Sequence, residues 1–363
     1  MTEEVKKKKS GLTLTEATHF GRMVVKYGGI AIVVLIVGRI FLKSLIAYWK
    51  AKNPPPPPPP TVGFGRLPAI GFPLQSAENK PLSYTLETPS GTTADFGDRA
   101  KVLLMLRSVP NLLADQRARE IASIHNFVFE PKVLGPNIYR WKKNQPLDMQ
   151  LEMNIFNLDF ELSSEYLSKP ELLSNKNLPD DYEAVQRVKN FLKNSDLLPK
   201  DIATAAGEIV YLKSLGGELQ PAVSYSDADF IQVDLNRIPI DKIHRMYGSE
   251  GYKGSVHAVL SGAFKGTNSI VELEYSYQEV DYQQVETYPI RTSQQAFRSL
   301  QAGEGYVISD EEVTEAIIRK VSLGYYQADE EQDYLQPIFV FEGDNGFIAY
   351  VPAVSLEYLQ TQE

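Results

Sequence analysis

The chain has 363 residues, no cysteine and a formal net charge of −9 at pH 7. The lack of cysteine excludes disulfide bonds, thiolate metal sites and cysteine nucleophiles. Residues 1–61 hold 10 Lys and Arg against 3 Asp and Glu, a net charge of +7, whereas the remaining residues hold 27 against 43, a net charge of −16. Nucleic acid and anionic lipid headgroups repel an acidic domain, so we expect no nucleic acid partner.

A strongly apolar segment predicts one N-terminal transmembrane helix over residues 23–49. The 19 residues from Val24 to Leu42 would extend about 28 Å as a helix, close to the thickness of the bilayer hydrocarbon core. Basic residues are denser before this segment than after it, which predicts a cytoplasmic N-terminus and an extracytoplasmic C-terminal domain. We therefore expect a single-pass protein of the plasma membrane, with the helix as an uncleaved signal anchor.

Four residues near the end of this segment are candidate contacts with lipid or with a partner. Arg39 and Lys43 are four residues apart and share one face of a helix, where they can reach the headgroups or pair with another membrane protein. Tyr48 and Trp49 suit the headgroup layer. Membrane lipid and another envelope or membrane protein are the expected partners. A structural subunit of a membrane assembly, contacted through Arg39 and Lys43, is an alternative.

Seven consecutive prolines, Pro54–Pro60, follow the apolar segment. In polyproline II geometry they would reach about 22 Å, so we interpret residues 50–62 as a Pro-rich linker between the membrane and a large domain. A Pro-rich recognition motif is the alternative. Residues 1–22, which include Lys6–Lys9, are interpreted as a cytoplasmic basic tail. The segment Gly63–Pro73 mixes turn formers with apolar side chains, and we expect it to dock on the domain in an extended form.

Residues 63–363 predict an α+β fold with mainly antiparallel sheets and few helices, because strand patterns come in runs. We place a first α+β subdomain at 63–200 and a second at 201–363. Near the C-terminus we expect at least two of Phe339, Phe341, Phe347 and Tyr350 to be buried, and Phe339 and Phe341 to face opposite sides of their strand. Helices are predicted at Leu112–His125, Asp180–Asn194 and Ser293–Leu300, and hairpins join Leu147–Ile155 to Leu158–Leu162, Val256–Phe264 to Ile270–Tyr277, and Ile338–Phe341 to Phe347–Val351.

The C-terminal part carries a distinctive order of short motifs between about residues 285 and 355. Tyr288-Pro-Ile290 precedes a short helix, Gly303-Glu-Gly-Tyr306 follows it, and a strand ending at Tyr326 leads through an acidic loop to the last hairpin. This order resembles the last, PepSY-like domain of the YycH and YycI regulators. The resemblance implies a bitopic bacterial protein with an α+β domain outside the membrane. Those regulators restrain a cell-wall sensor kinase through helix contacts, and they have no catalytic residues to transfer.

The sequence shows no catalytic or metal-binding motif, so we expect no cofactor and no metal. The domain's histidines, His125, His244 and His257, are dispersed and are interpreted as structural. The acidic runs Ser226–Asp229 and Asp329–Asp333 lack the spacing of a calcium loop and are interpreted as solvated loops. Tyr275, Tyr277, Tyr325 and Tyr326 could line a groove for a peptide or glycan, although half-buried sheet faces are the preferred interpretation.

These observations favour a non-enzymatic binding, regulatory or scaffold protein of the bacterial cell envelope. One alternative is an envelope enzyme, such as a cell-wall hydrolase, whose carboxylates converge only in space. A pocket holding two close carboxylates would favour that alternative.

Overall fold

The structure is a computed structural model that describes residues 14–53, 58–75, 81, 83–109, 111–173, 177–309 and 314–360. It divides into two compact units, Met1–Pro59 and Pro60–Glu363, and each is described by itself. The basic cluster Lys6–Lys9 and the prolines 54–57 lie outside the described residues, so the basic tail and the polyproline linker remain predictions.

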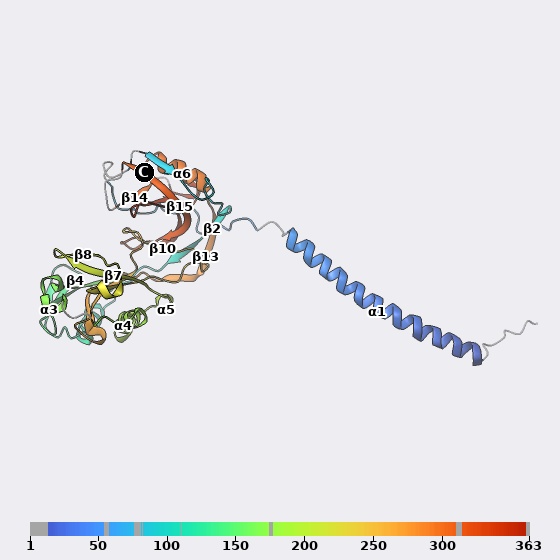
Figure 1. The fold of residues 1–363 in the computed structure, drawn as a ribbon, viewed down its shortest axis with the longest axis horizontal. Coiled ribbons are helices and arrows are strands. Elements are labelled where there is room, and N and C mark those ends of the chain that lie inside the picture. The colour runs from blue at the N-terminus through green and yellow to red at the C-terminus, as the bar shows by residue number, and fades with distance from the viewer. Residues whose placement is uncertain are drawn as a thin grey trace, which may run out of the picture. The chain divides into compact units, whose positions relative to one another are not determined.

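Within the described residues, the first unit consists mainly of one long helix, α1 (Leu14–Lys52), of 39 residues (Figure 1). Within it, Thr18–Lys50 has a mean hydropathy of 2.4 and is long and apolar enough to cross a membrane. Its apolar side chains are exposed along its length; Leu35, for example, is 72% exposed. A helix with exposed apolar side chains on every side is typical of a membrane environment. The predicted segment 23–49 lies inside α1, and its orientation remains a prediction.

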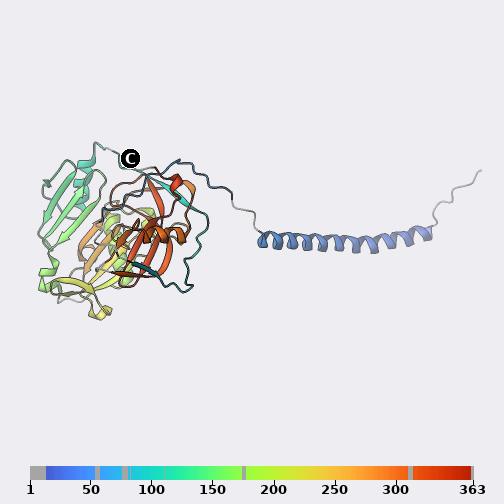
Figure 2. The ribbon, with the colours of Figure 1, turned by 90° about the horizontal axis from the view of Figure 1, so that it is seen from above.

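The second unit is built on two sheets, and this confirms the predicted α+β fold with mostly antiparallel strands. We call the nine-stranded sheet the first sheet and the eight-stranded sheet the second sheet (Figures 1 and 2). The first sheet is antiparallel throughout, in the order β3-β4-β5-β6-β12-β11-β9-β7-β8. Its strands are β3 (Lys132–Val133), β4 (Ile138–Lys143), β5 (Met149–Asn154), β6 (Phe160–Ser164), β7 (Glu208–Leu215), β8 (Glu218–Pro221), β9 (Phe230–Leu235), β11 (Val256–Ser261) and β12 (Ile270–Tyr275).

One face of the first sheet is apolar and the other is polar, because residues alternate along each strand. Leu151, Leu162 and Val233 belong to the core that the sheet shares with α2 (Ala114–Ile124) and α4 (Asp181–Asn194). Asp180 caps α4, since its Oδ1 accepts a hydrogen bond from the Glu183 amide at 2.7 Å. Shorter helices complete this part: η2 (Tyr166–Ser168), α3 (Pro170–Leu173), α5 (Lys200–Ala203), η3 (Tyr225–Asp227) and η4 (Gly266–Ser269).

The second sheet centres on the antiparallel strands β15, β16 and β17, with β14 on one edge. The short strands β1 and β10 pair in parallel with β15, while β2 joins β16 to β13. Its strands are β1 (Ser83–Leu86), β2 (Arg99–Met105), β10 (Met246–Tyr247), β13 (Val280–Pro289), β14 (Tyr306–Ile308), β15 (Glu315–Tyr326), β16 (Tyr334–Gly343) and β17 (Ile348–Pro352).

Helix α6 (Ser293–Gln301) packs on one face of the second sheet, where Phe297 lies 6.0 Å from the ring of Phe341. Thr292 and Gln295 form a capping box at the start of α6. The four C-terminal aromatic residues expected to contribute to the core are all buried. The expectation that Phe339 and Phe341 face opposite sides is wrong, because residues two apart on a strand point to the same side, and both lie in the core with α6.

The predicted subdomain boundary between residues 200 and 201 falls inside the first sheet, which includes strands from both sides of it. The first sheet uses residues 132–275, whereas the second sheet combines β1 and β2 with strands that follow β12, and with the short strand β10. All strands of the first sheet are therefore inserted between β2 and β13 of the second. Only pairing between distant strands defines this division, and local sequence patterns do not show such pairing.

The segment after the prolines, residues 61–75, docks on the second unit as expected; we call it the lead-in. The Thr61 amide donates to Thr287 Oγ1 at 3.0 Å, and the Val62 amide donates to the Thr287 carbonyl at 3.1 Å. Leu67 is fully buried, and its amide donates to the carbonyl of Tyr358, in the 3-10 helix η5 (Leu356–Tyr358), at 2.8 Å. Docking therefore begins at Thr61, within the predicted linker 50–62.

Candidate functional site

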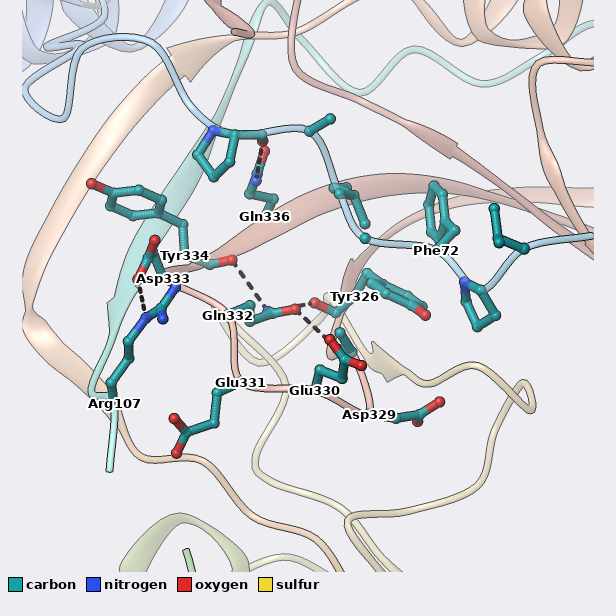
Figure 3. A pocket seen from close by; sticks show the side chains of 17 residues that line it. Phe72, Arg107, Tyr326, Asp329, Glu330, Glu331, Gln332, Asp333, Tyr334 and Gln336 are labelled. Atoms are coloured by element: carbon teal, nitrogen blue, oxygen red, sulfur yellow. Dashed lines mark hydrogen bonds and ion pairs between the residues drawn. The ribbon is translucent and has the colours of Figure 1, made fainter. Parts of the chain in front are cut away.

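A cavity of about 580 Å³ lies between the lead-in and the acidic loop that joins β15 to β16 (Figure 3). We call it the acidic groove. Its size falls within the range typical of ligand sites. The residues that line it are Pro68–Leu74, Arg107, Tyr326, Ala328–Asp333, Tyr334 and Gln336.

The lead-in forms one wall of the acidic groove and is held there by the second sheet. The ring of Phe72 stacks on Tyr306 with centroids 5.3 Å apart, and it meets the edge of Tyr326 at 4.7 Å. Gln336 Nε2 donates to the Pro68 carbonyl at 2.9 Å. Tyr326 and Gln336 belong to β15 and β16, so the central strands of the sheet position this wall.

The acidic loop forms the opposite wall, and Gln332 holds its conformation. Gln332 Nε2 donates to the carbonyls of Tyr326 at 3.0 Å and Tyr334 at 3.2 Å, at the two ends of the loop. Its Oε1 accepts from the Ala328 amide at 3.0 Å, and the backbone amide of Gln332 donates to Gln278 Oε1 at 2.9 Å. These hydrogen bonds hold the backbone of the acidic loop in one conformation. The positions of the neighbouring carboxylates are therefore defined as well.

The groove carries a formal charge of −3, because four carboxylates face one guanidinium. Arg107 pairs with Asp333 at 2.5 Å, but both side chains are exposed, and such pairs contribute little to stability. Glu331 accepts from the Ser108 amide at 2.9 Å, and Asp329 accepts from Ser249 Oγ at 2.8 Å. The negative charge of the groove is therefore only partly neutralised by the protein.

Two buried polar atoms of groove-lining residues have no hydrogen-bond partner among the residues that the structure describes. They are the hydroxyl of Tyr326, a residue 1% exposed, and Oε1 of Gln336, a residue 4% exposed. Leaving such an atom without a partner costs about 1–3 kcal/mol. Burial, and then the charge of Asp329, raises the pKa of Tyr326, so this hydroxyl keeps its proton. A ligand that reached these atoms with hydrogen-bond donors would relieve part of the cost.

The four tyrosines suggested as surface contacts are not brought together. Tyr275 ends β12 of the first sheet, and Tyr277 follows it, whereas Tyr325 and Tyr326 end β15 of the second sheet. Tyr275, Tyr325 and Tyr326 are buried, and Tyr277 is half-buried. The second sheet is covered on both faces, so even the adjacent residues Tyr325 and Tyr326, which point to opposite sides, are both inside. An exposed tyrosine groove is therefore not formed, and of the four only Tyr326 lines the acidic groove.

The membrane contact candidates Arg39, Lys43, Tyr48 and Trp49 all lie in α1 with exposed side chains. No partner for the side chains of these four residues is found within the described part of the chain, and their contacts with lipid or another helix remain predictions. The described residues contain no group of three or more His, Asp or Glu side chains placed to hold a metal ion.

Sequence reasoning identified the acidic run Asp329–Asp333 but interpreted it as a solvated loop, and it missed Phe72, Arg107, Gln332 and Gln336 as parts of a site. The one usable signal was Gln336, an amide inside the otherwise apolar run that forms β16. Nothing local indicated that the lead-in would form the opposite wall.

No protein-family model and no curated protein matches this chain. Among solved structures, it is similar to an uncharacterized protein from Eubacterium rectale ATCC 33656, with a TM-score of 0.33 and 11% sequence identity. That match covers 73% of this chain and 86% of the other.

Proposed function

We propose that the chain is a non-catalytic binding protein of the bacterial cell envelope, anchored in the plasma membrane by α1. The N-terminus would be cytoplasmic and the second unit extracytoplasmic. The exposed apolar surface of α1 supports the anchor, and the excess of basic residues before it supports the orientation.

The acidic groove carries this proposal, and its chemistry suggests a cationic segment of another envelope protein as the ligand. Lys and Arg side chains donate hydrogen bonds and accept none, so they suit the carboxylates of the acidic loop. An extended segment also suits a narrow space between the lead-in and a loop. The same charge disfavours nucleic acid as a ligand.

A regulatory or scaffold role is part of the same proposal. The lead-in is both a wall of the groove and the segment next to the prolines, so a ligand in the groove would contact the chain close to its anchor. The resemblance of the C-terminal motifs to the YycH and YycI regulators agrees with a role in controlling a membrane partner.

Binding of a defined cationic peptide to the full chain in detergent micelles tests the groove. The probe is a fluorescent octapeptide of alternating Lys and Ala, followed by anisotropy. The double variant Glu330→Gln/Glu331→Gln should weaken binding about tenfold, since charge-assisted contacts are each worth about 1.5–3 kcal/mol and solvent reduces this at the exposed Glu330 and the half-buried Glu331. Glu218→Gln/Glu304→Gln, which makes the same charge change at exposed positions outside the groove, should leave affinity unchanged. Equal weakening by both pairs would indicate nonspecific attraction to an acidic protein.

Protease added to intact cells from which the outer layers have been removed tests the topology. The second unit should be digested and a fragment near α1 retained. Protection of the second unit with loss of the N-terminal tail would reverse the proposed orientation.

A further inference from the structure

A second cavity, of about 710 Å³, separates the polar face of the first sheet from the edge of the second. We call it the inter-sheet cleft. It shares no lining residue with the acidic groove. Its walls are β7, β9 and β11 on one side, β14 and the β16–β17 turn on the other, and the segment after β10 between them. The lining residues used below are Glu208, Gln232, Asp234, Tyr252, His257 and Ile308.

Asp234 organises the polar wall of the cleft. It lies opposite His257 on β11 and Glu208 on β7 in the strand register, so the three side chains share one face of the sheet. His257 Nδ1 donates to Asp234 Oδ1 at 2.8 Å, and Gln232 Nε2 donates to Asp234 Oδ2 at 2.7 Å. These bonds orient both side chains and leave His257 Nε2 and Gln232 Oε1 without a partner in the described residues. Burial alone would lower the pKa of His257, but the Asp234 carboxylate outweighs it and raises the pKa.

The two basic side chains that line the cleft, Arg245 and Lys253, each pair with carboxylates. Arg245 pairs with Glu208 across the cleft. Lys253 pairs with Glu250 at 2.8 Å and with Glu274 at 2.7 Å. Because Arg245 and Lys253 already have carboxylate partners, the cleft offers no free cation to an anionic ligand. Its unused hydrogen-bonding capacity suits a neutral polar ligand.

The opposite wall is largely apolar. Ile308 is half-buried at the end of β14, and Ile348 and Phe347 lie next to it in the cleft lining. The ring of Tyr252 lies on the connecting segment, with the Arg245 guanidinium 5.0 Å from its centroid. A ligand in this space would contact hydrogen-bonding groups on one side and apolar side chains on the other.

We propose that the inter-sheet cleft binds a neutral, polyhydroxylated ring, such as one sugar unit of a glycan. A hydroxyl group both donates and accepts, so adjacent hydroxyls can hydrogen-bond to His257 Nε2, whichever way its proton lies, and donate to Gln232 Oε1. The C–H face of the ring would pack against Ile308 and Ile348. The volume is within the range of sites that enclose small ligands. This site is independent of the acidic groove and of its proposed ligand.

Ligand-observed NMR with the full chain tests this site, in micelles of a detergent that has no sugar headgroup. The probes are maltotriose and triacetylchitotriose, each titrated to saturation. At least one sugar should show a saturation-transfer difference signal that reaches a plateau as its concentration is raised. Gln232→Met should weaken its binding about fivefold, the effect of losing one neutral hydrogen bond. Gln220→Met makes the same change on the edge strand β8, outside the cleft, and should have no effect.

Ile308→Ser, from the opposite wall, should weaken the same sugar by a similar factor, and it keeps the test valid if Gln232→Met misfolds. The Glu330→Gln/Glu331→Gln variant should bind the sugar normally. The proposal is overturned if neither sugar shows a saturation-transfer signal that reaches a plateau, or if Gln220→Met weakens binding as much as Gln232→Met.

Discussion

Gln336 donates a hydrogen bond from Nε2 to the carbonyl oxygen of Pro68 at 2.9 Å, across a sequence separation of 268 residues. The bond joins the beginning of β16 to the lead-in. The segment next to the prolines is thereby attached to the centre of the second sheet, and the acidic groove exists only while this attachment holds.

The attachment depends on Phe72, whose ring contacts Tyr306, Tyr326 and Tyr350. Phe72→Ala should lower the free energy of unfolding by about 1–3 kcal/mol, less than for a fully buried ring. It should also make the lead-in sensitive to proteases under native conditions. Leu74→Ala, at a fully exposed position of the same segment, should change neither property. Denaturant unfolding and timed proteolysis of the two variants measure the difference, and equal behaviour would mean that the ring does not hold the lead-in.

Arg237 forms an ion pair with Asp201 near the point where the chain passes between the two sheets. The two charged groups are 3.5 Å apart, and the arginine side chain is 0% exposed. It also lies over the Tyr277 ring and donates to the Gln278 carbonyl at 2.6 Å. Asp201→Asn keeps the shape but leaves a buried cation without a counterion, which should cost about 3–5 kcal/mol.

The double variant Asp201→Asn/Arg237→Met should regain at least half of that loss, because the unpaired charge is gone. Urea unfolding midpoints of the single and double variants test this. If the double variant is less stable than Asp201→Asn alone, the buried charge is not the cause.

His125 should make the fold sensitive to acid. Its ring stacks on Phe191 at 3.6 Å, and burial, with a smaller effect from Lys143, lowers its pKa to about 4. In the unfolded chain the pKa is about 6.5. The folded state therefore binds fewer protons between these values, and about 3 kcal/mol of stability, fully present above pH 6.5, is lost as the pH falls to 4.

His125→Phe keeps the stacking and removes the titration, so its unfolding free energy should fall less between pH 7 and pH 4 than that of the wild type. Ser195, the hydrogen-bond partner of His125, retains bonds to the carbonyls of Phe191 and Leu192. If the unfolding free energies of the two proteins fall equally with pH, His125 is not the group responsible for the acid sensitivity.

Residues 60–363 should fold without α1. Both sheets and their cores lie within this range, and it forms one compact unit. Expressed alone, it should be soluble and unfold in a single cooperative transition that Trp141, buried in the core of the first sheet, reports by fluorescence. Aggregation that is rescued only by restoring α1 would show that the unit depends on the membrane.

Local features of the fold could be predicted from the sequence. The caps at Asp180 and Thr292 fixed the starts of α4 and α6, and the β16–β17 hairpin follows from a turn in which Asn345 and Gly346 have positive φ values of 54° and 72°. The division into two sheets could not be predicted. β1 pairs with β15 across more than 200 residues, and such a pairing leaves no periodic signal nearby.

The acidic groove and the inter-sheet cleft could be predicted from the sequence only in part, for the same reason. The acidic run of the groove was visible in the sequence, but its opposite wall is formed by a segment about 260 residues earlier. His257 appeared to be an isolated histidine because its partner, Asp234, lies on a neighbouring strand rather than nearby in sequence. Both sites depend on strand order, which the sequence pattern alone does not determine.

The insertion of the first sheet has a consequence for how the chain matures during synthesis. All strands of the first sheet are available once residue 275 has left the ribosome, so that part can fold early. Strands β1 and β2 are synthesised long before their partners β15, β13 and β16. The lead-in is synthesised even earlier, and its hydrogen-bond partner in η5 is synthesised later than all of these strands. The apolar α1 emerges before every strand. With α1 in a membrane, the nascent chain would have β1 and β2 unpaired until residues 280–343 have been made.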